Sequence, residues 1–380
     1  AYSVTMAPLV VKDKVIVGVG GGEFGIRGYV AAYDAETGEE VWKTYTIPGP
    51  GEPNHDSWED DDWQHGGAPV WITGSFDPEL NLSYWGVGNP GPDWNAGQRP
   101  GDNLYSDSVI ALDVDTGELK WYFQFTPNDG YDYDAVQVPV LADMVWRGTP
   151  SKVMMWANRN GYFYVLDRVT GKFLEGKPYV KVNWSSGLDE NGRPIPTPQP
   201  EGMPTFPGNQ GGTNWYPPSY SPRTGLFYFS AWQDYATIYR PEESEYRPGK
   251  AFLGGGFTVL APVPEAPVVG IGRTNLINNW TNEVGFGSLK AMDPQTGEAV
   301  WSYDQFDVSD SGMLTTASDL LFTGGREGYF HAIDARSGDL LWKVSLGGQI
   351  VMAPVTFSID GVQYVSVISG HALSTFALAD

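Results

Sequence analysis

Three short segments carry the carboxylate and amide side chains best suited to chemistry. Glu23 follows the glycines Gly20–Gly22, and Asn89 is held by the proline after it. Asp132 and Asp134 alternate with tyrosines. On a strand this spacing would place both carboxylates on one face, where repulsion costs stability unless a cation or shared proton compensates. Each segment also fits an ordinary role, as a solvated loop acid, an Asx-Pro turn or an exposed acidic loop.

Two larger side chains are further candidates. Arg159 precedes the apolar run Tyr162–Leu166 and could clamp a ligand carboxylate or carbonyl with two guanidinium nitrogens. A surface arginine is the ordinary alternative. Trp71 is one of 15 Trp, so packing is its ordinary role.

Two other patterns do not support a site. Gly20-x-Gly22-x-x-Gly25 matches the dinucleotide-binding fingerprint, but strand-like residues follow it where the fingerprint requires a helix. The acidic stretch Asp56–Asp62, with His55 and His65 on either side, has no regular ligand spacing. We interpret it as a solvated loop.

A repeated phrase defines the elements that must position these residues. It consists of an apolar stretch, Asp, two residues, Thr-Gly or Ser-Gly, and then Trp eight positions after the Asp. The stretch predicts a strand, the Asp and Gly a hairpin turn, and the Trp a return strand. Some copies lack the Trp. Seven such turns begin at Asp34, Asp77, Asp113, Asp167, Ser221, Asp293 and Asp334. Their spacing predicts the four-stranded blades of an all-β propeller, which grows by adding blades and so forms a single domain over residues 1–380.

The composition agrees with this fold and excludes some partners. The chain has 48 Gly and 29 Pro, which suits many turns, and no apolar run long enough to span a membrane. Its net charge of -23 argues against binding to nucleic acid or anionic membranes. The absence of Cys excludes disulfides, zinc-thiolate sites and an attached c-type haem within this sequence.

Several motifs, in this order, resemble the pyrroloquinoline quinone (PQQ)-dependent alcohol dehydrogenases, the methanol and ethanol dehydrogenase family. They are Gly22–Gly28, Gly86–Pro90, Asp102–Asn103, Tyr131–Asp134, Arg159–Gly161 and the repeated turns. The resemblance covers nearly the whole chain and implies an eight-bladed quinoprotein β-propeller. About seven blades are recognisable, and the family's adjacent cysteine pair is absent. An N-terminally truncated chain that lacks its signal peptide is therefore expected.

The resemblance also implies roles for individual residues. The metal ligands would be Glu23, Asn89, Asp132 and Asp134, with Asp132 as the catalytic base. The quinone would contact Thr5, Gly20, Gly21, Gly22, Trp71 and Arg159. A metal-bound PQQ would take hydride from a primary alcohol and pass the electrons to a cytochrome c, in the periplasm.

Asp134 bears on the metal, because in this family a second acid two positions after the catalytic Asp marks the lanthanide-using members. The sequence therefore favours a lanthanide ion, with Ca²⁺ as the alternative. Asp310 falls near a position held by a tryptophan in methanol dehydrogenases, so methanol specificity is not expected. Two other functions remain open at this point: a non-catalytic scaffold propeller that binds protein partners, and a sugar or aldose quinoprotein dehydrogenase.

Overall fold

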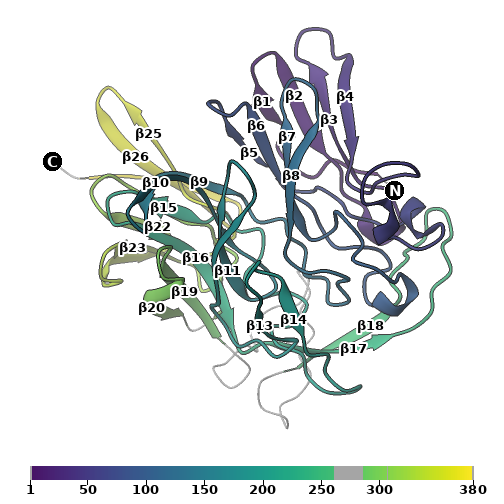
Figure 1. Ribbon diagram of the computed structural model, residues 1–380. Coiled ribbons are helices and arrows are strands. Elements are labelled where there is room, and N and C mark those ends of the chain that lie inside the picture. The colour runs from purple at the N-terminus through teal and green to yellow at the C-terminus, as the bar shows by residue number, and fades with distance from the viewer. Residues whose placement is uncertain (1, 261–285, 306, 379–380) are drawn as a thin grey trace.

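The computed structural model describes residues 2–260, 286–305 and 307–378, and these are built of β-strands joined by turns and loops (Figure 1). The only helical pieces among them are short 3-10 turns: η1 (Gly22–Phe24), η2 (His55–Ser57), η3 (Asp62–Gln64) and η4 (Ala96–Gln98). The prediction of an all-β fold is confirmed. No helix in the described ranges is long and apolar enough to cross a membrane.

Five antiparallel sheets of four strands form the body of the molecule. The first has β1 (Leu9–Val11), β2 (Lys14–Gly18), β3 (Tyr29–Asp34) and β4 (Glu40–Tyr45). The second has β5 (Ser75–Asp77), β6 (Leu82–Gly86), β7 (Ser108–Asp113) and β8 (Leu119–Gln124). The third has β9 (Val140–Trp146), β10 (Thr149–Ala157), β11 (Tyr162–Asp167) and β12 (Phe173–Pro178).

The remaining strands complete these sheets and add smaller ones. The fourth sheet has β15 (Ser219–Ser221), β16 (Leu226–Gln233), β19 (Phe286–Asp293) and β20 (Glu298–Gln305). The fifth has β21 (Leu314–Thr315), β22 (Leu320–Thr323), β23 (Tyr329–Asp334) and β24 (Leu340–Ser345). A sixth, three-stranded sheet has β25 (Val355–Ile359), β26 (Val362–Ser369) and β27 (Ala372–Ala377). Two separate hairpins are β13 (Ser185–Leu188) with β14 (Pro194–Pro196), and β17 (Ala236–Pro241) with β18 (Gly255–Leu260).

The count of about seven recognisable blades needs correction, because the seven turns belong to five sheets. The turn that begins at Asp77, the last residue of β5, joins β5 to β6 in the sheet that also carries the Asp113 turn. The turn that begins at Ser221, the last residue of β15, likewise joins β15 to β16 in the sheet that carries the Asp293 turn. A turn between the first two strands and a turn between the last two have similar chemistry, so the sequence pattern alone counts both as separate blades.

Consecutive sheets pack face to face, and single strands supply both faces. In β11, Tyr164 and Leu166 pack against the second sheet, whereas Phe163 and Val165 pack against the fourth. Because side chains of a strand alternate between faces, a strand between two sheets must be apolar throughout. This explains the continuous apolar runs before each repeated Asp.

The repeated tryptophan packs on the turn of the following sheet. A Cβ added to Gly117 would meet the Trp42 ring at 2.6 Å, and one added to Gly171 would meet the Trp121 ring at 2.5 Å. Trp42 Nε1 also donates to the carbonyl oxygen of Val114, at 2.9 Å. The same pattern joins Trp301 to Gly338. The prediction that these rings pack between neighbouring units is confirmed at these three junctions.

Candidate functional site

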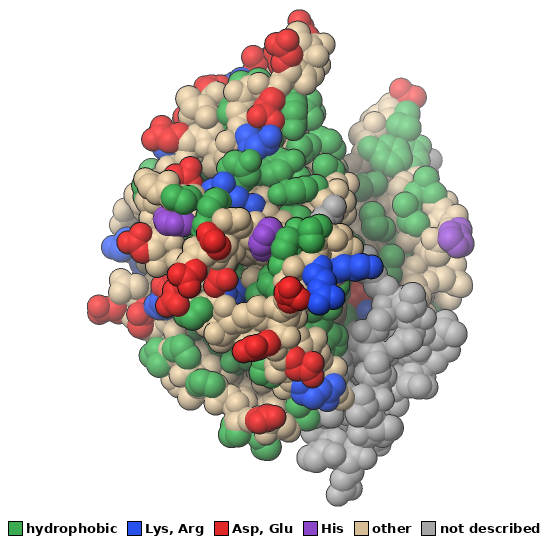
Figure 2. Space-filling view, turned by 90° about the vertical axis from the view of Figure 1, so that its right-hand side faces the viewer, with side chains coloured by type: hydrophobic (Ala, Val, Ile, Leu, Met, Phe, Trp, Pro, Cys, Tyr) green, Lys and Arg blue, Asp and Glu red, His purple; other side chains and the backbone are tan. Residues whose placement is uncertain are grey.

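A cavity of about 960 Å³ lies among the loops that join these sheets, and it collects nearly all the residues singled out from the sequence. Figure 2 shows a deep furrow between the larger part of the molecule, nearer the viewer on the left, and a part farther from the viewer on the right. The predicted residues that line the cavity are Thr5, Gly20, Gly21, Glu23, Trp71, Asn89, Asp132, Asp134 and Arg159. Gly22 lies behind this wall, where a Cβ would meet the Pro69 ring at 3.0 Å.

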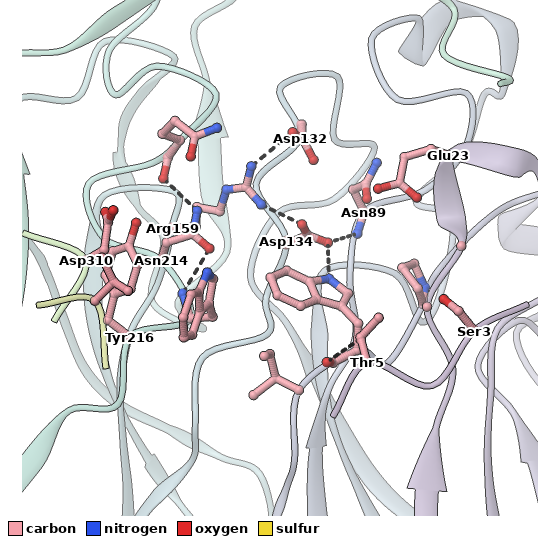
Figure 3. Close-up of a pocket in the computed structure, with 18 of the residues that line it drawn as sticks. Ser3, Thr5, Glu23, Asn89, Asp132, Asp134, Arg159, Asn214, Tyr216 and Asp310 are labelled. Carbon is pink, nitrogen blue, oxygen red and sulfur yellow. Dashed lines mark hydrogen bonds and ion pairs between the residues drawn. The ribbon is translucent and has the colours of Figure 1, made fainter. Parts of the chain in front are cut away.

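Arg159 is the centre of this group (Figure 3). Its Nη2 lies 3.0 Å from Asp132 Oδ2 and its Nη1 lies 2.5 Å from Asp134 Oδ2, while Nε donates to the Asn209 carbonyl oxygen at 3.0 Å. Burial alone would lower the pKa of the guanidinium, but Asp132 and Asp134 outweigh burial and raise it above its usual value. The side chain is therefore a permanent buried cation that faces two carboxylates.

Asp134 is buried against the Asn89 turn. Its Oδ1 accepts hydrogen bonds from the Asn89 backbone N–H at 2.8 Å and from Trp71 Nε1 at 3.3 Å. A Cβ on Gly88 would lie only 2.2 Å from that same oxygen. The glycine in the Gly86–Pro90 segment thus leaves the space that the carboxylate occupies.

Asp132 lies in a loop, which corrects the premise that the two acids share one face of a strand. Residues 131–134 belong to no strand, and Asp132 has a left-handed backbone with φ of 65°. Asp tolerates this conformation better than most residues. Burial raises the pKa of Asp132 well above its usual value, and Asp134 adds to the rise, while Arg159 opposes it. The two carboxylates do converge, but through Arg159 instead of through strand periodicity.

Glu23 is presented by the short turn η1, which has left-handed glycines at both ends. Gly21 has φ of 115° and Gly25 has φ of 60°. Figure 3 shows the Glu23 carboxylate facing Asn89. The local glycine-rich sequence therefore forms a tight loop that carries an acid to the cavity, as the sequence suggested.

Trp71 and the N-terminal segment form another wall. Thr5 Oγ1 donates to the Trp71 carbonyl oxygen at 3.1 Å, and the Gly20 N–H donates to the Ser3 carbonyl oxygen at 2.8 Å. Ser3 also lines the cavity, although the sequence gave no reason to select it.

A second set of buried acids, which sequence reasoning missed, lies around Arg99. Asp93, Asp107 and Asp129 are all buried. Burial raises the pKa of Asp93 well above its usual value, and the charges of Asp132 and Glu23 raise it further. Because Asp93, Asp132 and Glu23 affect one another, this wall has an excess of negative charge that a cation would relieve.

The opposite wall of the cavity is formed by residues from later loops. Asn214, Tyr216 and Asp310 lie across from Asp134 in Figure 3. Arg326 Nη2 forms an ion pair with Asp310 Oδ2 at 2.7 Å. Of these residues only Asp310 was noted from the sequence, since the others stand in irregular segments with no repeat or motif to mark them.

The donor chemistry fits a hard cation beside a flat ligand. Carboxylate and amide oxygens are the donors that such ions prefer, and the cavity size suits a small organic molecule. Within the described residues, however, no three His, Cys, Asp or Glu side chains are already arranged to hold a metal ion. Arg159 engages two of the candidate carboxylates, and the fourth candidate donor is the amide of Asn89.

Comparison with known proteins gives a consistent result. The family model described as "Glucose/ethanol/alcohol dehydrogenase, beta-propeller domain", of the PQQ type, matches residues 1–197 and 185–365. Quinoprotein alcohol dehydrogenase PedH of Pseudomonas putida is 40% identical over 97% of this chain. The lanthanide-dependent methanol dehydrogenase of Methylacidiphilum fumariolicum is 37% identical over 97% of it.

Solved structures agree with the sequence matches. A quinohemoprotein alcohol dehydrogenase, ADHIIG of Pseudomonas putida, superposes with a TM-score of 0.86 at 38% identity, covering 98% of this chain and 56% of that one. A europium-containing methanol dehydrogenase superposes with a TM-score of 0.85 at 36% identity, covering 96% of this chain and 65% of that one. The chain spans 63% of the length of PedH and 62% of that of the methanol dehydrogenase.

Proposed function

Because the chain belongs to the family of glucose, ethanol and alcohol dehydrogenases with a PQQ-type β-propeller domain, we propose that it oxidises a primary alcohol to the aldehyde with PQQ. One observation carries the proposal: Glu23, Asn89, Asp132, Asp134 and Arg159 line one cavity. A propeller that served only as a scaffold would have no need for this combination of oxygen donors and a buried arginine.

The candidate residues fall into three groups: those that would bind the metal, those that would contact the quinone, and the one that would accept the proton. Glu23, Asn89, Asp132 and Asp134 would hold the ion. Trp71 would lie under the quinone ring, with Thr5 and Gly20–Gly22 at its edge. When bound, metal and PQQ together supply an electrophilic carbonyl that accepts hydride from the alcohol carbon.

Asp132 would accept the proton of the alcohol hydroxyl. A base must be ionised to do so, and burial disfavours ionisation of this carboxyl. Arg159 opposes this effect of burial on the pKa without cancelling it, and a metal ion held beside Asp132 would favour the ionised carboxylate further. Arg159, whose Nη atoms point at both acids, would also donate hydrogen bonds to the quinone carbonyls.

We further propose a lanthanide ion as the preferred metal, with Ca²⁺ as the alternative. Asp134 supplies an additional carboxylate that is buried next to Asn89. A trivalent ion gains more than a divalent one from an extra anionic oxygen ligand. The electron acceptor would be a cytochrome c, and the compartment would be the periplasm.

Reconstitution tests both proposals. The chain is mixed with PQQ and either lanthanum or calcium, and the quinone absorption band and dye reduction with ethanol are measured. We expect a bound-quinone band, alcohol-dependent reduction that is larger with lanthanum, and loss of turnover with a retained band in Asp132→Asn. A panel of alcohols, aldehydes and sugars separates an alcohol dehydrogenase from a sugar dehydrogenase.

Two results would contradict these proposals separately. If no quinone band formed with either metal, the enzymatic function would be wrong and a scaffold role would remain. If calcium alone gave full activity that Asp134→Ala did not diminish, the lanthanide preference would be wrong while the enzyme class stood.

A further inference from the structure

The β17–β18 hairpin is not needed by the sheet from which it arises. It is inserted between β16 and β19, which pair directly with each other from Phe227↔Met292 to Gln233↔Phe286. Within the described residues the hairpin forms its own two-stranded sheet, with one isolated bridge from Thr237 to Thr205, and it lies apart from the fourth sheet at the lower right of Figure 1. Its role must therefore come from what it contacts.

The first contact is with the loop of Asp132. Tyr239 Oη donates a hydrogen bond to the carbonyl oxygen of Tyr131 at 2.9 Å. The two rings also meet edge to face, with centroids 5.4 Å apart. The hairpin thus holds the peptide unit that directly precedes Asp132.

The second contact is with the loop that follows Asn89. The Trp94 N–H donates to the Leu253 carbonyl oxygen at 2.9 Å. Gln98 Nε2 donates to the Ser244 carbonyl oxygen at 2.6 Å, and the Ser244 N–H donates back to Gln98 Oε1 at 3.0 Å.

The third contact is with the turn of Glu23. The Phe252 N–H donates to the carbonyl oxygen of Glu23 itself, at 2.7 Å. The Tyr246 ring stacks on His65 with centroids 3.5 Å apart and planes 13° apart. His65 Nδ1 lies 3.1 Å from the Gly25 carbonyl oxygen, so the stack supports the same turn.

We propose that the β17–β18 hairpin, residues 236–260, is a clamp that sets the spacing of the three metal-ligand loops, with Tyr239, Tyr246 and His65 as positioning residues. This inference rests on the proposed function, because it concerns the same site. The three loops arise at different places in the chain, and one segment binds the backbone of each. Groups that orient metal ligands typically change affinity 10- to 100-fold when they are removed.

The test measures metal affinity apart from activity. Terbium is titrated into the full chain with PQQ present, and its luminescence, sensitised by protein tryptophan, gives the dissociation constant, while thermal melts give stability. We expect Tyr239→Phe and Tyr246→Leu each to weaken terbium binding about 10-fold. Tyr246→Phe keeps the stacked ring and is expected to bind like the unmodified chain.

Tyr84→Phe is the matched control for general destabilisation. Tyr84 Oη donates to the Arg168 carbonyl oxygen at the same 2.9 Å, but between the second and third sheets. We expect this variant to lower the melting temperature and leave terbium affinity unchanged. Equal losses of affinity in Tyr84→Phe and Tyr239→Phe, or no loss in the clamp variants, would overturn the clamp alone. If the unmodified chain bound no terbium, the clamp would be wrong because the loops would hold no such ion, whereas the proposed function would fail only if no quinone band formed with either lanthanum or calcium.

Discussion

At the scale of single residues, the site requires a residue without a side chain, Gly88, next to its buried acid Asp134. Asp134 can accept from Asn89 and Trp71 because Gly88 has no Cβ, which would lie 2.2 Å from Asp134 Oδ1. The side chain that supplies charge and the residue that makes room for it stand 46 positions apart, by their numbers in the sequence.

Gly88→Ala should therefore impair the site in the same way as loss of Asp134. The added methyl group must displace the carboxylate or the turn, so we expect terbium affinity to fall at least about 10-fold. Luminescence titration measures it. Gly148→Ala is the control, because a Cβ there meets no atom within 4 Å although its φ of 88° imposes strain. An affinity unchanged in Gly88→Ala would show that Asp134 is not required near its present position.

The sequence predicted most of the residues that line the cavity, but it did not predict how their side chains are arranged there. Nine of the predicted residues line the cavity. The pairing of Asp132 and Asp134 with Arg159 could not be predicted, because it depends on a left-handed Asp132 and on packing between the second and third sheets. Asp93 and Arg326 carry no local motif, so a single sequence offers no signal for them.

At the scale of elements, three junctions between neighbouring sheets consist of a tryptophan ring that packs on a glycine turn. Gly117 and Gly38 occupy equivalent turns with φ of 72° and 75°, yet only Gly117 lies under a tryptophan. Substitutions at Gly117 and Gly38 therefore separate the effect of backbone strain from the effect of packing against a tryptophan ring.

Gly117→Ala should destabilise the chain more than Gly38→Ala. Both add strain of about 1 kcal/mol in a left-handed turn. Only Gly117→Ala also overpacks the Trp42 ring, which costs a further 1–3 kcal/mol by rough estimate. Urea unfolding of both variants measures the difference. Equal losses would mean that the ring moves aside without cost.

Buried His331 in β23 should make stability depend on pH. Its Nδ1 has no hydrogen-bond partner among the described residues, and burial, aided by Lys343, lowers its pKa from 6.5 to about 4. As the pH falls from 6.5 towards 4, His331 is therefore protonated in the unfolded chain but stays neutral in the folded chain. Stability is lost over that window, by up to about 3 kcal/mol.

Urea unfolding at pH 7.5 and pH 4.5 tests this effect. We expect His331→Leu to lose less stability than the unmodified chain between these two pH values. His371→Leu, at an exposed position, controls for the general effect of replacing a histidine by leucine. An identical pH dependence in His331→Leu and the unmodified chain would contradict the prediction.

The strands were predictable at this scale, but their grouping was not. The turn chemistry of Asp34 recurs in the structure, where Oδ1 accepts from the backbone N–H of Glu36 and of Thr37. Such local bonds follow from local sequence. Which turns share a sheet depends on contacts distant in sequence, and the β17–β18 hairpin interrupts the fourth sheet without any repeat to mark it.

At the scale of the whole molecule, charge is the dominant feature. The chain has 46 acidic and 23 basic side chains, for a net charge of -23. Several ion pairs among the described residues have both side chains exposed and contribute little individually, so mutual repulsion should lower stability at low salt.

Raising NaCl from 20 to 500 mM should therefore raise the melting temperature, by about 2 °C or more. Thermal melts in EDTA measure this screening without metal binding, and choline chloride serves as the control for specific sodium binding. A melting temperature that fell with both salts would indicate that attractive pairs outweigh repulsion.

The ring-on-turn junction also gives the array of sheets a direction. The first, second and fourth sheets each place a tryptophan on the glycine turn of the next sheet, so at these junctions the units add head to tail. The two ends of the array differ: nothing lies within 4 Å of a Cβ built on Gly38, whereas Trp342 of the fifth sheet meets the Phe376 ring of the sixth sheet with centroids 5.5 Å apart. A sheet that joined the first end in the same way would place a ring on the Gly38 turn, as the Trp42 ring lies on Gly117.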